Sequence, residues 1–163
     1  MMRILAPILM LQVAVSLATF ALTPVAPPPL AASALTAKDE SIEQLIARAE
    51  SARPEDRPAL YLEVARQKAE TADQFYRAGN ADAGNATLRE VVTFSKKATD
   101  ASIATGKRLK NTEITLRKMV EKFRDVKRTV TFEDQAPIQQ TMDELEKMRT
   151  DLLSAMFGKK KSK

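Results

Sequence analysis

The 163-residue chain contains no histidine, no cysteine and no tryptophan, and only four glycines. Without histidine and cysteine it has no imidazole for acid–base chemistry, no thiol nucleophile, no disulfide and none of the usual ligands of zinc, haem or iron–sulfur clusters. A di-iron site in a helical bundle needs Glu-x-x-His pairs, so this site is excluded as well. We therefore predict that the protein is not an enzyme and that it binds no cofactor and no metal.

Carboxylates and methionines are the remaining side chains that could catalyse a reaction or bind a metal. The carboxylates within residues 143–146 lie beside Lys147 and Arg149, which is typical of a solvated, salt-bridged helix surface rather than a catalytic pair. Met142, Met148 and Met156 could bind Cu(I) in an exported protein. Their helical spacing among leucine and isoleucine favours a role as core residues instead.

The first 34 residues differ in composition from the rest. After Arg3, residues 4–22 form an uncharged apolar run, and an uncharged segment rich in proline and alanine follows. This pattern, with small residues at 32–34, predicts a secretory signal peptide and spacer over residues 1–34. Cleavage after Ala21 is an alternative, and so is retention as a membrane anchor. In each case we expect the remainder to be exported, to the periplasm or outside the cell.

Residues 35–158 are rich in helix-forming residues, which predicts one all-α domain, an antiparallel bundle of about four to five helices. We expect helices near residues 39–51, 58–78, 82–106, 107–130 and 137–157, with breaks at proline, glycine or β-branched residues. The basic tail, residues 159–163, is expected to be disordered. It either keeps the chain soluble or makes weak contact with an anionic membrane.

The segment 107–130 has the most regular apolar pattern. Leucine, methionine, phenylalanine and valine recur at spacings of three and four, and this heptad seam is interrupted only by Thr112. Such a helix either packs into the bundle or projects as a rod, whose seam would then pair with a second copy in a homodimeric coiled coil. We expect helices 58–78, 107–130 and 137–157 to form the core, and the small, polar second half of 82–106 to contribute little.

Residues 75–92, FYRAGNADAGNATLREVV, join the second and third expected helices. Ala72 lies three residues before Phe75, Gly79 four after it and Leu88 thirteen after it. Over residues 58–106 these offsets resemble a single helical hairpin of the tetratricopeptide family, although Gly84 stands where that family prefers alanine. The resemblance implies protein binding. The offsets do not recur elsewhere, so the chain lacks the stacked repeats that form a peptide-binding groove.

Charge is unevenly distributed along the chain. Residues 96–128 hold eleven Lys and Arg against four Asp and Glu, whereas the flanking regions 35–95 and 129–158 are acidic. Either the acidic helices neutralise the basic one, which is the interpretation we prefer, or its basic face meets an anionic partner. The candidate partner surface comprises Lys107, Arg108, Lys110, Arg117, Lys118, Lys122, Arg124, Lys127 and Arg128.

Together these features predict an exported, non-enzymatic protein-interaction module, an adaptor or scaffold, with a protein partner that the sequence does not identify. The alternative is a periplasmic holdase-type chaperone, similar in kind to small helical stress chaperones, which would expose methionine-bearing apolar surface to unfolded clients. Nucleic acid is not expected as a partner. On helix 107–130 only Phe123 is aromatic, and it lies on the apolar seam, so the basic face has no stacking platform.

Overall fold

The computed structural model describes residues 40–158; the predicted signal peptide and spacer and the basic tail lie outside the described residues. Within the described region the chain forms only helices: α1 (Ile42–Ser51), α2 (Arg57–Arg77), α3 (Ala81–Thr105), α4 (Leu109–Thr129), the short 3-10 helix η1 (Phe132–Asp134) and α5 (Gln135–Phe157). The predicted all-α bundle is confirmed, and each expected helix lies within three residues of its observed bounds.

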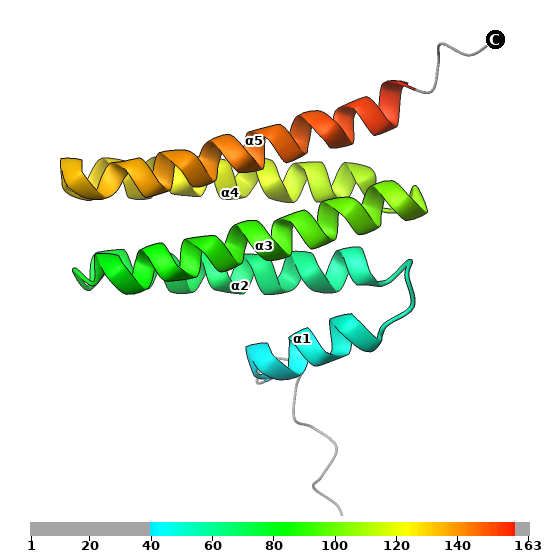
Figure 1. Cartoon of the computed structure of the whole chain (residues 1–163), viewed down its shortest axis with the longest axis horizontal. Coiled ribbons are helices and arrows are strands. Elements are labelled where there is room, and N and C mark those ends of the chain that lie inside the picture. Colours follow the sequence, from blue (N-terminus) through cyan, green and yellow to red (C-terminus); the bar gives the residue numbers. More distant parts are fainter. Residues whose placement is uncertain (1–39, 159–163) are drawn as a thin grey trace, which may run out of the picture. The chain divides into compact units, whose positions relative to one another are not determined.

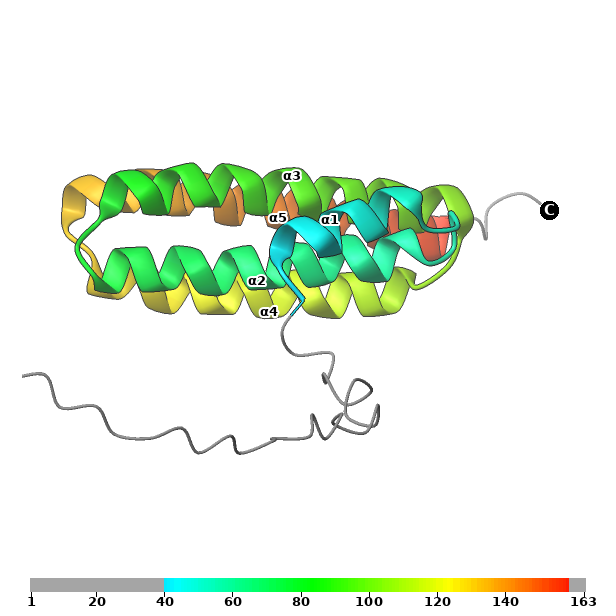
Figure 2. The ribbon, with the colours of Figure 1, turned by 90° about the horizontal axis from the view of Figure 1, so that it is seen from below.

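Two antiparallel hairpins make up the bundle. Helices α2 and α3 form the first and α4 and α5 the second, and α2 lies beside α4 while α3 lies beside α5 (Figures 1 and 2). Since the connections are short and the direction alternates along the chain, the neighbours from different hairpins run parallel to each other. Helix α1 packs mainly against α2.

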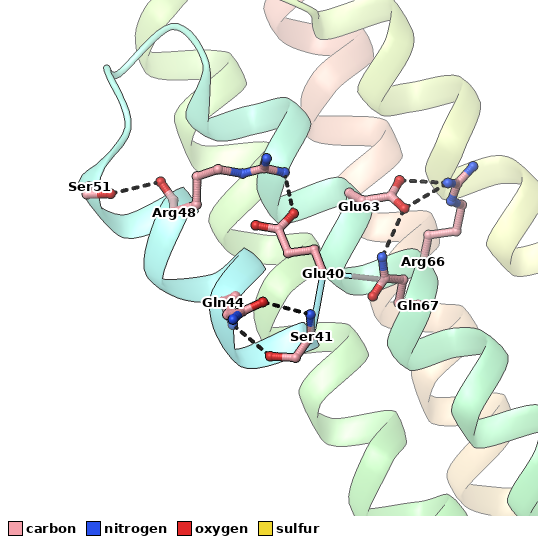
Figure 3. Close-up of polar contacts among 8 residues, drawn as sticks. All are labelled: Glu40, Ser41, Gln44, Arg48, Ser51, Glu63, Arg66 and Gln67. Carbon is pink, nitrogen blue, oxygen red and sulfur yellow. Dashed lines mark hydrogen bonds and ion pairs between the residues drawn. The ribbon is translucent and has the colours of Figure 1, made fainter. Parts of the chain in front are cut away.

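A capping box determines where α1 begins. The backbone N–H of Gln44 donates to Ser41 Oγ and that of Ser41 donates to Gln44 Oε1, each at 3.2 Å (Figure 3). This reciprocal pair satisfies two N–H groups that would otherwise lack a partner, so the helix starts at Ile42 and not at residue 39 as expected. Arg48 of the same helix pairs with Glu40 at 2.8 Å (Figure 3).

The heptad seam of α4 faces the interior of the bundle. Leu116, Met119, Phe123 and Val126 are all buried, with Phe123 fully inaccessible to solvent. The interpretation of this helix as a projecting coiled-coil rod is therefore wrong, because its apolar side chains are already covered by the same chain. Two of the three methionines of α5, at positions 142 and 148, are also buried as predicted for core residues.

The second half of α3 corrects the sequence-based expectation. Ser95, Thr99 and Ser102 are at most 2% exposed, so this polar stretch lies in the core instead of contributing little to it. Ser102 Oγ and Thr112 Oγ1 of α4 share a buried hydrogen bond of 2.8 Å. The residue that interrupts the α4 seam thus meets the polar part of α3, and small side chains here let the two helices pack together.

Small residues also shape the first hairpin. Ala65, Ala69 and Ala72 of α2 are buried, and α2 and α3 make the most extensive contact of any two helices. At the start of α3, a Cβ atom added to Gly84 would lie 2.9 Å from Cε2 of Tyr76. The Tyr76 ring therefore occupies the space of a side chain, which explains glycine at a position where the tetratricopeptide pattern prefers alanine.

Candidate functional site

Helix α4 turns its cationic face away from the buried seam. Of the nine predicted surface residues only Lys122 and Lys127 are half-buried, and the other seven are exposed. Lys110, Arg117 and Arg124 recur at every seventh residue, so they follow one line along the helix over roughly 21 Å. The structure thus brings these three charges together on a single exposed stripe.

Three of the nine residues are engaged within the protein. Lys122 pairs with Glu70 and Asp73 of α2, Arg128 pairs with Asp125 at 3.2 Å, and Lys127 donates to Gln139 Oε1 of α5 at 2.7 Å. Only Lys122 reaches a carboxylate on another helix. The preferred interpretation, in which acidic helices neutralise the basic one, is supported by an ion pair at Lys122; the other eight surface residues form no ion pair with another described helix.

The remaining six have no carboxylate partner in residues 40–158: Lys107, Arg108, Lys110, Arg117, Lys118 and Arg124. Glu113 of α4 does not pair with them. It accepts instead from Arg149 of α5, with Nη2 at 2.8 Å and Nε at 3.1 Å. Glu121 and Asp125 share the exposed side of α4, so the face is predominantly but not exclusively positive.

Lys122 belongs to a structural cluster that ties α4 to α2. Its Nζ lies 3.5 Å from Oδ2 of Asp73, whose other oxygen accepts from Arg77 Nε at 2.8 Å. Burial alone would raise the pKa of Asp73, but the Arg77 hydrogen bond and the charges of Lys122 and Arg77 outweigh it and hold that pKa below its usual range. Sequence reasoning could not find this cluster, because its partners are about fifty residues apart.

An open groove runs beside the cationic face, between α4 and α2. One section of about 300 Å³ is lined by Lys118 and Thr115 from α4 and by Arg66 and Glu70 from α2. The next section toward the start of α4 is again lined by Arg66. Arg66 pairs with Glu63 on its own helix at 2.7 Å (Figure 3). Its charge is therefore offset within α2, and the sequence pattern did not identify it as part of the groove.

Four large apolar side chains in the described region are exposed: Ile103, Phe132, Leu153 and Phe157. Phe132, which is 87% exposed, lies on η1 between α4 and α5. The other three lie near the ends of α3 and α5, at the opposite end of the bundle (Figure 1). The apolar periodicity of the sequence did not predict that these exposed apolar residues lie at the two ends of the bundle. Periodicity identifies the buried faces of helices and not their ends.

Comparisons with known protein families, curated proteins and solved structures find no match to this chain. Within residues 40–158 no group of three acidic side chains is arranged to hold a metal ion. Among those same residues no helix is both long and apolar enough to cross a membrane. The candidate surface therefore has to be interpreted from its own charge and geometry.

Proposed function

We propose that this protein is an exported, non-enzymatic interaction module, an adaptor or scaffold, that binds an acidic protein partner through α4. The binding surface is the cationic face formed by Lys110, Arg117, Lys118 and Arg124. One observation carries the proposal: these exposed cations lie close together, and none has a carboxylate partner among the described residues. Export rests on the composition of residues 1–34 alone.

The spacing of the charges indicates what the partner should offer. An α-helix or extended segment with carboxylates at intervals of about 10 Å would match the seven-residue repeat of Lys110, Arg117 and Arg124. Arginine suits this role because its guanidinium group can donate two parallel hydrogen bonds to one carboxylate. Such a complex should form rapidly at low salt and weaken as ionic strength rises.

The distribution of methionine supports the adaptor over the holdase alternative. A holdase of the kind considered would present methionine-bearing apolar surface, whereas Met119, Met142 and Met148 are at most 8% exposed and only Met156 of α5 is half-buried among these helix methionines. The exposed apolar side chains lie at the two ends of the bundle and do not line a groove along it. The folded domain therefore offers little apolar area to unfolded clients.

In-cell crosslinking with mass spectrometry tests the proposal. We expect the wild-type chain to capture one dominant partner, and a variant carrying Arg117→Ala and Arg124→Ala to lose it. The control carries Arg89→Ala and Lys147→Ala, two exposed cations on α3 and α5 that also have no carboxylate partner in the described region. In both double variants, each substitution should change the free energy of unfolding by no more than about 0.5 kcal/mol.

Two results would count against the adaptor. If the control loses the partner as completely as the α4 variant does, the effect is one of general charge and not of this face. If the wild type instead captures many unrelated exported proteins, in amounts that grow under heat or acid stress, the holdase alternative replaces the proposal.

A further inference from the structure

We infer that one end of the bundle is a docking surface for an anionic phospholipid bilayer. This surface, the apolar–cationic end, comprises Ile103 at the end of α3, Leu153 and Phe157 in the last turns of α5, and three cations at the start of α4. These cations are Lys107, Arg108 and Lys110. It shares Lys110 with the α4 face of the proposed function, but the inference does not depend on that function.

The helix ends that carry these residues lie together. In both views α3 and α5 finish at the same end of the bundle, and α4 begins there (Figures 1 and 2). Phe157 is 70% exposed, and Ile103 and Leu153 are each 39% exposed, so their apolar surface faces solvent. Exposed apolar groups of this size at a helix end favour transfer to a bilayer interface.

Among the described residues, unpaired cations lie at the same end of the bundle as these apolar side chains. The three α4 cations have no carboxylate partner in residues 40–158, and the chain continues directly from Gly158 into Lys159, Lys160, Lys161, Ser162 and Lys163. Two carboxylates near this end are paired: Glu50 contacts Lys97 at 3.4 Å and Asp56 contacts Arg53 at 3.7 Å. Glu55 and Asp151 have no cation partner among the described residues, so the balance stays positive.

A bilayer fits this combination better than a protein does. Apolar insertion and electrostatic attraction are the two signals that together hold a peripheral protein on an anionic membrane, and neither is sufficient alone. The opposite end provides an internal comparison. Phe132 is even more exposed, but it is followed directly by Glu133 and Asp134, whose charges would be repelled by anionic lipid. Only the apolar–cationic end has both signals.

The absence of tryptophan makes a local test straightforward. Phe157→Trp introduces a single indole reporter into the full chain, and Phe132→Trp is the matched control at the other end. Each variant is mixed with vesicles of phosphatidylglycerol and phosphatidylcholine, or of phosphatidylcholine alone, with and without brominated lipid. Any membrane affinity of residues 1–34 is common to both variants, so the difference between them reports on the bundle ends.

We expect the emission of the Phe157→Trp variant to shift to the blue and to be quenched by brominated lipid in the anionic vesicles only. The Phe132→Trp variant should not respond. Adding Lys107→Ala and Lys110→Ala should weaken binding roughly fivefold for each cation removed, and high salt should abolish it.

Three outcomes would overturn the inference. One is an unchanged emission spectrum of the Phe157→Trp variant, and another is an equal response at both positions or in uncharged vesicles. The third is a blue shift caused by polyglutamate but not by vesicles, which would assign this end to an acidic polypeptide and not to lipid.

Discussion

The two hairpins of this bundle are built on different principles. In the first, α2 and α3 pack through small residues: three buried alanines of α2, and Gly84 of α3 beneath the ring of Tyr76. In the second, α4 and α5 fill the core with large side chains, including Phe123 and Leu145, both fully buried. The first interface therefore combines small residues with large ones such as Tyr61 and Phe94, whereas the second depends mainly on the volume that its large side chains occupy.

The difference also extends to the polar contacts. The second hairpin is joined across its helices by the salt bridge between Arg149 and Glu113, whose side chains are only 19% and 14% exposed. The first hairpin has Lys68 paired with Glu90 at 2.8 Å, and its Tyr76 hydroxyl donates to Asn85. Replacing a large buried side chain by a small one should destabilise the second hairpin most. Replacing a small buried side chain by a large one should destabilise the first.

The largest effect is expected from Phe123→Ala in the second hairpin. Deleting a fully buried phenylalanine removes its transfer free energy and leaves a cavity, which should lower the free energy of unfolding by about 3–5 kcal/mol. Urea unfolding followed by circular dichroism measures the change. Glu121→Ala, an exposed position on the same helix, is the control and should stay within about 0.5 kcal/mol. A loss below about 1 kcal/mol for Phe123→Ala would contradict the comparison.

Alkaline pH should weaken the first hairpin through Tyr76. Burial raises the pKa of its phenol to about 12, and the nearby Asp134 carboxylate adds to the shift. Because the raised pKa favours the neutral phenol in the folded state, its stabilising contribution is complete below about pH 10 and declines as the pH rises toward 12.

The Tyr76→Phe variant isolates this contribution. The variant loses the hydrogen bond to Asn85, at a cost of about 1 kcal/mol at neutral pH, but its unfolding free energy should fall less steeply than that of the wild type above pH 10. Urea unfolding of both proteins between pH 9 and 12 provides the comparison. If the free energies of unfolding of the two proteins depend on pH in the same way, ionisation of the Tyr76 phenol is not coupled to folding.

Enlarging a small residue of the first hairpin should cost more than a volume-conserving change in the second. Ala72 is fully buried on α2, so Ala72→Leu should destabilise the protein by about 1–3 kcal/mol through overpacking. The reference change in the second hairpin is Leu145→Met, which conserves volume and should cost less than about 1.5 kcal/mol. Thermal unfolding of the two variants ranks them. Equal melting temperatures would show that the interface of α2 and α3 is less tightly packed than described.

The smallest effect is expected at Gly84, where the same substitution should have opposite effects on stability in two backgrounds. Alanine improves helix formation by up to about 1 kcal/mol, but its Cβ would lie 2.9 Å from Tyr76, so the ring or the helix must shift. We expect Gly84→Ala to destabilise the wild type and to stabilise a Tyr76→Ala background. A double-mutant cycle measures the coupling between the two sites. The same sign in both backgrounds would contradict the contact.

Much of the fold was predictable because several helices carry a clear apolar face. The heptad pattern of residues 107–130 identified the buried face of α4, and glycine and proline marked most helix ends. The second half of α3 was not predictable in this way. Serine and threonine at positions 95, 99 and 102 are typical of a solvated surface, and only their tertiary neighbours show that they are buried.

The hydroxyl groups of α3 differ in how they are satisfied. Ser102 shares its hydrogen bond with Thr112, whereas Ser95 Oγ and Thr99 Oγ1 have no hydrogen-bond partner among the described residues. A buried hydroxyl without a partner is unfavourable, so a prediction from residue preferences alone would place these side chains outside.

The candidate surface was only partly predictable for a related reason. Local sequence showed that α4 is basic, but not which cations are already paired. Lys122 and Glu70 are 52 residues apart, and their contact arises from the parallel packing of α4 against α2. The tetratricopeptide resemblance stays a prediction, because any two tightly packed antiparallel helices would form such a hairpin.

The short turn between α2 and α3 affects the order of folding as well as the final structure. Only three residues, from 78 to 80, separate these helices, and the left-handed conformation of Gly79 reverses the chain. Contacts between sequence neighbours form fastest, since little loop entropy is lost in closing them. We therefore expect the first hairpin to assemble early and to serve as the template on which the second condenses, so that folding starts well before the C-terminal helix is in place.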